Sequence, residues 1–368
     1  MMTEKENSRQ IMKNRPLRKG WTTGACATAA TKAALTALIT GEFPDPVGII
    51  LPKGDVPYFQ LSLSSIGEGY ALAGIIKDAG DDPDVTNGAT IISIVHPAPP
   101  NNGIIFKAGD GVGTVTRPGL PISVGEAAIN PVPRQLMQTI CEEICAEYGL
   151  PADLVITISV PNGQEIAKKT WNPRLGIEGG ISILGTTGVV HPFSCSAWIH
   201  SIHRGIDVAR AEGVKHVIAA TGSTSEDAAQ SLYHLPDFAL LDMGDFVGGV
   251  LKYLHNHPID RLTLSGGFAK FTKLAQGHLD LHSSKSQVDK DFLWMIAHNA
   301  GLNETFKERI LNANTAKEVL DMTLQENIDI ATPIALEVQK IAKKTLRDAP
   351  VNVEVIITDR KGKILAKI

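Results

Sequence analysis

The sequence predicts a protein of the mixed α/β and α+β class, built from two domains. We expect an N-terminal α+β domain over residues 1–150 and a C-terminal Rossmann-like three-layer domain with a mostly parallel sheet over residues 151–368. Three observations predict this division. The chain of 368 residues favours two domains over one. Strand-like runs cluster before residue 150, and strands alternate with helices after the Gly-Leu-Pro turn at residues 149–151.

The N-terminal part combines two predicted helices with a cluster of short strands. Thr22 and Thr23 can cap an Ala-rich buried helix over residues 24–40, which Gly41 would end, and an apolar stripe predicts a second helix over 133–148. Turn residues separate the strand-like runs between these helices, which cover residues 47–51, 58–63, 70–76, 90–95 and 103–108.

The C-terminal part alternates strands with helices, which implies parallel strand pairing and a sheet covered on both faces. The predicted strands cover residues 153–160, 181–184, 216–220, 238–241, 261–264 and 351–358. The predicted helices cover residues 196–212, 225–233, 245–256 and 268–276, followed by a helical stretch over 287–347.

Composition indicates a cytoplasmic globular protein. The hydrophobic fraction is 43% and the formal net charge is -4, so no basic excess indicates nucleic-acid binding. Residues 1–20 contain no apolar segment of a secretory signal, and no apolar run approaches the roughly 18 residues that a membrane span needs. We expect reduced thiols at the four cysteines, which are Cys26, Cys141, Cys145 and Cys195.

Three predicted strands of the C-terminal part end in Gly/Ser/Thr-rich turns, at residues 185–188, 221–224 and 265–267. If the strands are parallel, these turns share the carboxyl-end edge of the sheet, where open α/β sheets bind ligands. Turns between strands and helices need glycines and caps in any case, and this explanation suffices for a single turn. Three turns on one edge favour a ligand site.

The ligand predicted at this edge is not ATP. Residues 180–187 resemble a phosphate-binding P-loop, but Thr186 replaces the lysine that would grip the phosphates. Residues 109–113 fail the dinucleotide spacing because Thr114 stands where a further glycine is expected. Asp242 could accept from a ribose diol or cap the helix that follows Gly244, and the sequence does not distinguish these roles.

Several other polar residues are candidate chemical groups. His191, Cys195, His200 and His203 match no metal-ligand spacing, so we expect no metal site. Cys26 lies at a helix start that favours a thiolate, although small apolar packing is the stronger interpretation. Basic residues flank the turns and could receive a polyanionic substrate; they are Lys53, Arg117, Lys168, Lys169, Arg174, Lys270 and Lys273.

An ordered series of motifs from about residue 17 to 358 resembles the cobalt-precorrin-5B C1-methyltransferase (CbiD) family. Each piece alone is weak, and their order is specific. The pieces are residues 18–27 (RKGWTTGACA), 160–163 (VPNG), 172–177 (NPRLGI), 178–188 (EGGISILGTTG), 221–223 (TGS), 265–270 (SGGFAK) and 277–278 (GH).

This resemblance implies methyl transfer from S-adenosylmethionine to C1 of a cobalt-containing corrinoid precursor in anaerobic cobalamin biosynthesis. A non-catalytic tetrapyrrole carrier of the same pathway is the alternative. Neither nucleic acid nor membrane is expected as a partner, and a homo-oligomer is left open. On this hypothesis the cofactor would bind Gly179, Gly180, Gly185, Thr186, Thr187, Gly188, Thr221, Gly222, Ser223 and Asp242. The substrate would contact Thr22, Thr23, Lys53, Arg117, Arg174, Ser265, Gly266, Gly267 and Lys270, and Cys26 or His191 would face the reaction as a catalytic group.

Overall fold

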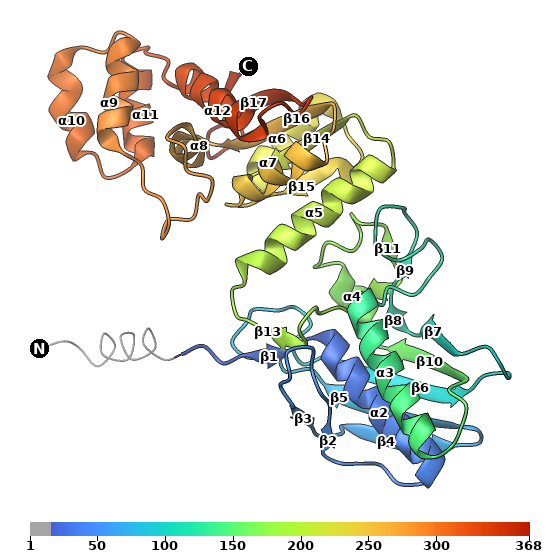
Figure 1. Cartoon of the computed structure of the whole chain (residues 1–368). Coiled ribbons are helices and arrows are strands. Elements are labelled where there is room, and N and C mark those ends of the chain that lie inside the picture. The colour runs from blue at the N-terminus through green and yellow to red at the C-terminus, as the bar shows by residue number, and fades with distance from the viewer. Residues whose placement is uncertain (1–15) are drawn as a thin grey trace, which may run out of the picture. The chain divides into compact units, whose positions relative to one another are not determined.

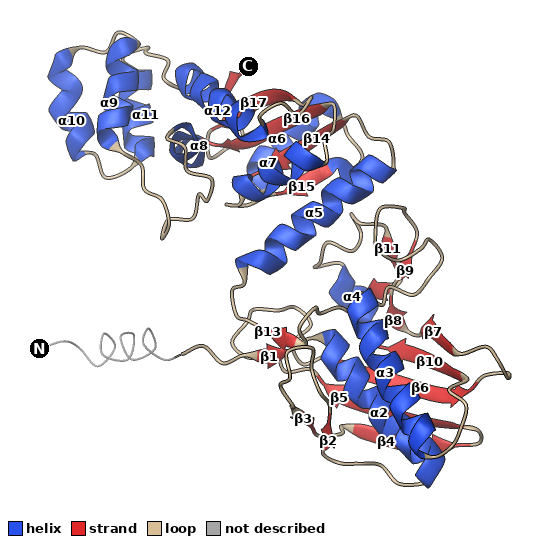
Figure 2. Ribbon diagram, in the orientation of Figure 1, coloured by secondary structure: helices blue, strands red, loops and turns tan. Residues whose placement is uncertain are grey.

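The computed structural model describes residues 16–368, so most of the N-terminal polar segment lies outside the described residues. The chain forms two compact units that divide between Cys195 and Ser196 (Figure 1). The division therefore falls later than the boundary expected at residue 150. The reason is β10 (Leu154–Ser159), which pairs with strands of the first unit. The mixed α/β class is confirmed (Figure 2).

The first unit is built on a five-stranded sheet in the order β4-β5-β6-β10-β7. Neighbouring strands are antiparallel except β10 and β7, which run parallel. The remaining strands are β4 (Leu63–Gly67), β5 (Tyr70–Ile76), β6 (Thr90–Pro97) and β7 (Ile104–Ala108). The strand predicted over 153–160 thus exists, but it belongs to this sheet and not to the parallel sheet of the second unit.

Two helices, α2 (Thr23–Thr40) and α3 (Pro131–Glu147), form the hydrophobic core of the first unit with the sheet. Thr22 caps α2, because its hydroxyl accepts from the Ala25 amide at 3.1 Å, and Gly41 ends the helix with φ +83°. Alanines dominate the buried surface of α2, and their small side chains let the helix lie close to β5 and β6.

Four two-stranded ladders and a short helix, α4 (Gly163–Ala167), complete the first unit. The ladders pair β1 (Gly20–Trp21) with β13 (Val189–Val190), β2 (Val47–Gly48) with β3 (Tyr58–Phe59), β8 (Gly111–Val112) with β12 (Gly180–Ile181), and β9 (Thr114–Val115) with β11 (Ile177–Glu178). Three of the ladders join segments that are more than 60 residues apart, and the β2–β3 ladder is local.

The second unit contains a five-stranded sheet in the order β15-β14-β16-β17-β18. The first four strands are parallel and β18 is antiparallel to β17. The bounds are β14 (His216–Ala220), β15 (Leu240–Asp242), β16 (Arg261–Gly267), β17 (Asn352–Thr358) and β18 (Ile364–Lys367). A short 3₁₀ helix, η1 (Asp237–Ala239), precedes β15.

Helices cover both faces of this sheet. Ile218 and Ile356 pack against α6 (Ser223–Tyr233) on one face. Alternate residues, such as Val217 and Val355, pack on the other face against α5 (Cys195–Ala211), α7 (Val247–Asn256), α8 (Phe268–Ala275) and α12 (Ala331–Leu346). The elements between α8 and α12 are α9 (Lys290–Asn299), η2 (Glu304–Phe306), α10 (Lys307–Asn312) and α11 (Ala316–Gln325).

No helix within residues 16–368 combines the length and apolar character that crossing a bilayer requires.

Candidate functional site at the edge of the parallel sheet

The strand order of the second unit places a topological switch point between β14 and β16. Counted along the unit, the strands lie in the order 2-1-3-4-5, so the connection after β14 leads to one side of the sheet and β16 lies on the other. Ligands of open α/β sheets bind outside the carboxyl ends of the strands at such a point. The turns after β14 and β16 meet there, since the Thr221 amide donates to the Ser265 carbonyl at 3.0 Å.

The expectation that three turns share this edge is therefore correct for two of them. The third, at residues 185–188, belongs to the first unit and follows the short strand β12. A glycine-rich turn after an apolar run looks the same locally whether the run joins a long parallel sheet or a two-residue ladder, and this is why the sequence pattern misassigned it.

A cavity of about 770 Å³ opens at this edge of the second unit. Its volume lies within the range of roughly 300–1,000 Å³ that small-molecule sites occupy. Predicted residues that line it are Thr221, Gly222, Ser223, Gly267 and Lys270. A Cβ added to Gly222 or Gly267 would meet no atom within 4 Å. The space beside both glycines is therefore not filled by other parts of the protein.

Lys270 ties the turn after β14 to the loop before α7. Its ammonium donates to the Thr221 carbonyl at 2.9 Å and forms an ion pair with Asp245 at 3.1 Å. The side chain is 38% exposed and still lines the cavity. Lys270 thus stabilises the turn after β14, and its partly exposed side chain faces the cavity.

Three further predicted residues of this unit do not line the cavity. The Ser265 hydroxyl donates to the Ser225 carbonyl at 2.7 Å, within the protein interior. A Cβ on Gly266 would lie 2.2 Å from the Phe271 ring, so glycine is required there for packing. Asp242 ends β15 beside β14, and its carbonyl accepts from the Trp198 indole at 3.1 Å.

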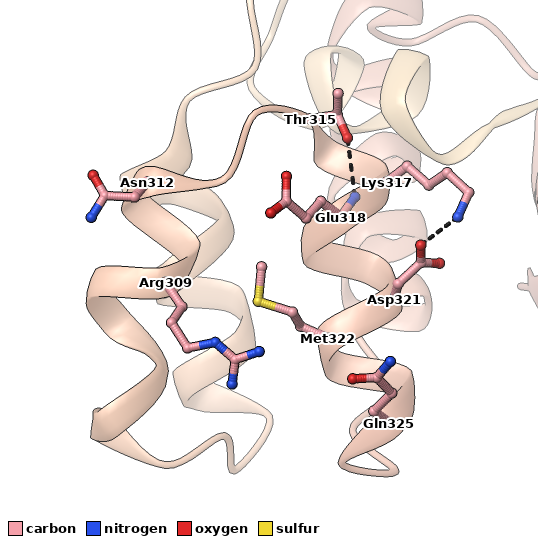
Figure 3. Close-up of a pocket in the computed structure, with 8 residues that line it drawn as sticks. All are labelled: Arg309, Asn312, Thr315, Lys317, Glu318, Asp321, Met322 and Gln325. Atoms are coloured by element: carbon pink, nitrogen blue, oxygen red, sulfur yellow. Dashed lines mark hydrogen bonds and ion pairs between the residues drawn. The ribbon is translucent and has the colours of Figure 1, made fainter.

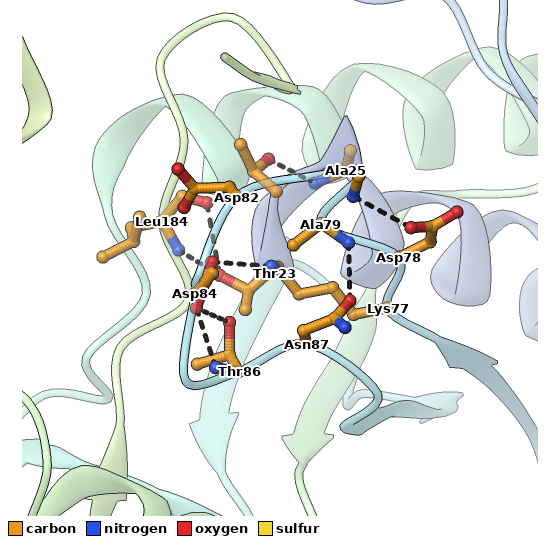
Figure 4. A network of polar contacts seen from close by, with 12 residues as sticks. Thr23, Ala25, Lys77, Asp78, Ala79, Asp82, Asp84, Thr86, Asn87 and Leu184 are labelled. Carbon is orange, nitrogen blue, oxygen red and sulfur yellow. Dashed lines mark hydrogen bonds and ion pairs between the residues drawn. The ribbon is translucent and has the colours of Figure 1, made fainter. Parts of the chain in front are cut away.

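In the first unit, the Thr22-Thr23-Gly24 segment and the 182–190 segment hold each other in place (Figure 4). The Thr22 amide donates to the Gly188 carbonyl at 3.0 Å, and the Gly24 amide donates to the Leu184 carbonyl at 2.9 Å. The Thr23 hydroxyl accepts from the Leu184 amide at 2.9 Å. Both threonines are buried, so their polar groups serve this junction.

Packing explains three of the glycines predicted to bind the cofactor. A Cβ on Gly180 would lie 2.0 Å from the Gly111 carbonyl oxygen. At Gly185 it would lie 2.3 Å from the Thr22 hydroxyl, and at Gly188 2.5 Å from the Leu51 side chain. Each position needs glycine whether or not a ligand binds nearby. Gly179 and Thr186 are exposed, while the Thr187 hydroxyl lies 3.3 Å from both the amide and the carbonyl of Val189.

The other basic residues predicted to meet the substrate do not line this cavity. Lys273 belongs to the second unit, and its ammonium donates to the Leu281 carbonyl at 2.9 Å; the rest lie in the first unit. Lys53 is exposed on the turn between β2 and β3. Arg117 and Arg174 are half-buried, and the alkyl chain of Arg117 lies against Gly176, where a Cβ would approach it to 2.3 Å.

The two predicted catalytic groups differ in their surroundings. Cys26 has no exposed surface, and burial raises the pKa of its thiol to about 12 although the charge of Lys77 opposes this shift. The thiol is therefore protonated at neutral pH, which fits the packing role and not that of a nucleophile. His191 is exposed beside β13.

Within the predicted histidine and cysteine cluster, His203 on α5 has a packing role. The ring of His203 stacks on Tyr253 with centroids 3.9 Å apart, and its Nε2 lies 3.3 Å from the Gly249 carbonyl. Burial lowers the pKa of His203, which favours the neutral ring. Within residues 16–368, no three histidine, cysteine or acidic side chains gather as a metal site would require.

Sequence reasoning missed two groups of charged residues. The ammonium of Lys77, only 1% exposed, pairs with Asp84 at 2.7 Å in the first unit (Figure 4). In the second unit, Lys317, Arg360, Lys361 and Lys363 line the cavity beside the predicted turns. The run of basic residues around Gly362, directly after a predicted strand, is the signal that could have identified them.

A second hollow, of about 470 Å³, lies between α10 and α11 (Figure 3). Two contacts join its lining residues: Thr315 caps α11 by accepting from the Glu318 amide at 3.1 Å, and Lys317 pairs with Asp321. No residue predicted from the sequence lines it.

Comparison with known proteins agrees with the motif series. The family model described as CbiD matches residues 10–192, and the model described as CbiD, C-terminal domain, matches residues 280–368. Relatives from Brucella canis and Brucella anthropi, both named cobalt-precorrin-5B C(1)-methyltransferase, are 79% and 76% identical over 352 residues, which is 96% of this chain and of each relative.

A crystal structure of the cobalamin biosynthesis protein CbiD from Archaeoglobus fulgidus is 22% identical and aligns with a TM-score of 0.38, covering 84% of this chain and 85% of that one. The family models and the close relatives confirm the resemblance that the motifs predicted, and this chain belongs to the CbiD family.

Proposed function

We propose that this chain is a C-methyltransferase that transfers a methyl group from S-adenosylmethionine to C1 of cobalt-precorrin-5B, giving cobalt-precorrin-6A, in anaerobic cobalamin biosynthesis. The main support for this reaction is the 79% identity of this chain, over 96% of both chains, to relatives named cobalt-precorrin-5B C(1)-methyltransferase. We assign the reaction to the cytoplasm, where the four free cysteines would stay reduced.

We place the methyl donor in the cavity of the second unit, against Thr221, Gly222 and Ser223. The parallel strands, the covered faces and the 2-1-3-4-5 order support a Rossmann-like description of this unit. The turns at its switch point leave open space at Gly222 and Gly267, as a bound ligand would require. Gly179 and Thr186 are exposed in the first unit and are retained only as a secondary hypothesis for donor binding.

S-adenosylmethionine supplies an activated methyl group on a sulfonium centre. The protein therefore needs no nucleophile of its own, which agrees with the buried, protonated thiol of Cys26. The turns orient the two reactants and exclude water, and orientation alone can contribute roughly 7–11 kcal/mol to lowering a barrier. Lys270 contributes by holding the turn after β14 in one shape through the Thr221 carbonyl and Asp245.

Calorimetric titration of the full chain with S-adenosylhomocysteine tests the donor site, and mass spectrometry of the product tests the reaction. The informative variant is Gly222→Leu, because φ of 162° suits any residue and the new side chain would enter the cavity. We expect the affinity of this variant for S-adenosylhomocysteine to fall about tenfold or more, equivalent to about 1.4 kcal/mol.

The matched control is Ser231→Leu, which adds the same side chain to an exposed position of α6 outside the cavity. Equal affinity of both variants would contradict the proposed donor site. If the protein binds the corrinoid but the corrinoid gains no methyl group, the result would contradict the methyltransferase proposal and favour a non-catalytic tetrapyrrole carrier.

A further inference from the structure

We infer that the turn of the β17–β18 hairpin, residues 359–363, binds carboxylates of the corrinoid substrate at the cavity of the second unit. This inference rests on the proposed function, because it concerns which ligand the cavity receives beside the methyl donor. Three cationic side chains, Arg360, Lys361 and Lys363, line the cavity from this turn.

The positive charge of this turn exceeds the negative charge beside it, because the acidic residues that line the cavity are Asp359 and Asp321, and Asp321 already pairs with Lys317. Of the cavity's other cations, Lys270 pairs with Asp245 and Lys317 pairs with Asp321. Among the described residues, Arg360, Lys361 and Lys363 have no ion pair, and all three are exposed. A cluster of unpaired cations lining a cavity, in a chain whose net charge is -4, indicates an anionic ligand with more than one negative charge.

The turn is held in shape before any ligand arrives. The Asp359 carboxylate accepts from the Lys361 amide at 2.8 Å and from the Lys363 amide at 2.9 Å. The turn also lies against the first turn of α6, since a Cβ on Gly362 would approach the Thr224 side chain to 3.4 Å. Because the backbone of the hairpin turn is already ordered, binding needs to fix only the ends of the three cationic side chains.

Apolar side chains form a further part of the cavity wall. Leu320 and Leu324 of α11 line it, together with Phe268 and Leu365, and Leu324 is 50% exposed. An apolar wall combined with unpaired cations fits a ligand that has a large apolar ring and peripheral carboxylates, which describes the proposed substrate. The methyl donor is itself a sulfonium cation, so a cationic cluster suits it less well.

The test compares the triple variant Arg360→Gln, Lys361→Gln, Lys363→Gln with a charge-matched control, Lys252→Gln, Lys285→Gln, Lys344→Gln. The control residues are exposed in the same unit and do not line the cavity. For the hairpin variant we expect the KM for the corrinoid to rise about tenfold, equivalent to about 1.4 kcal/mol. We expect kcat, the affinity for S-adenosylhomocysteine and the melting temperature to match those of the control.

A binding measurement that does not depend on catalysis uses uroporphyrin, a polycarboxylated tetrapyrrole, followed by its fluorescence. The wild-type protein should bind it, salt should weaken this binding, and the hairpin variant should bind less and depend less on salt. Unchanged KM and unchanged uroporphyrin binding in the hairpin variant would overturn the inference, and so would an equal loss of cofactor affinity. Absence of methyl transfer by the wild-type protein would instead overturn the proposed function.

If the triple variant melts at a lower temperature than the control, the single variants Arg360→Gln and Lys361→Gln give the same comparison. Both positions are exposed, so loss of the charge does not disturb the core.

Discussion

The adjacent glycines at 179 and 180 give a direct test of whether the glycine-rich segment of the first unit serves packing or ligand binding. A Cβ on Gly180 would lie 2.0 Å from the Gly111 oxygen and 2.1 Å from its carbonyl carbon, far inside ordinary contact distance. Main-chain atoms of the β8–β12 ladder cannot rotate away as a side chain can. Overpacking destabilises by about 1–3 kcal/mol and occasionally more, so we expect about 3 kcal/mol or more for Gly180→Asn.

Gly179→Asn is the matched control. Gly179 has φ +88° and no atom within 4 Å of the added Cβ, and asparagine tolerates the left-handed region better than most residues. We expect a loss below about 1 kcal/mol. At about 2–4 °C per kcal/mol for a unit of this size, Gly180→Asn should lower the melting temperature by about 6–12 °C and Gly179→Asn by less than about 4 °C. Thermal unfolding followed by circular dichroism measures both, and equal melting temperatures would refute the packing argument.

Three further outcomes are expected. Lys77→Met should lower the free energy of unfolding by about 1–3 kcal/mol, because it leaves the Asp84 carboxylate, which is 25% exposed, without its ion pair, and denaturant titration should show recovery in the Lys77→Met, Asp84→Leu double variant. Burial of Glu354 would raise its pKa, but Tyr233, Thr263 and Arg261 bind the carboxylate and hold the pKa below its ordinary value of 4.5. Its stabilisation is therefore present above pH 4.5 and lost as the pH falls toward the lower folded value, a loss that acid titration of Glu354→Gln should not show. Of the four thiols only Cys195 is exposed, so a thiol reagent should modify one cysteine rapidly in the folded protein and all four in denaturant; rapid labelling of Cys26 would contradict its buried position.

The sequence predicted elements well where the pattern was local. Residues 70–76 and 216–220 form strands with the predicted bounds, because alternating or continuous apolar runs between turn residues determine them. The turns at 221 and 265 were correctly placed together, since parallel strands end at one edge.

The pairing of β10 could not be predicted in this way. A β-branched run does not specify its neighbour, and the choice between two sheets depends on contacts with β6 and β7. The same limit applies to the glycines: the requirement at Gly185 or Gly180 comes from Thr22 and Gly111, which are distant in sequence. The cationic hairpin was missed because the sequence pattern predicted no strand after residue 358, where β18 forms.

The junction between the start of α2 and the 182–190 segment has a consequence for synthesis of the chain. The Thr23 and Leu184 groups that bond to each other are 161 residues apart. At about 5–20 residues per second, the ribosome makes Leu184 roughly 8–32 s after Thr23. During that interval the Ala-rich helix has left the exit tunnel without the carbonyl and amide that complete its first turn. The first unit is therefore expected to finish folding only as its last segment emerges.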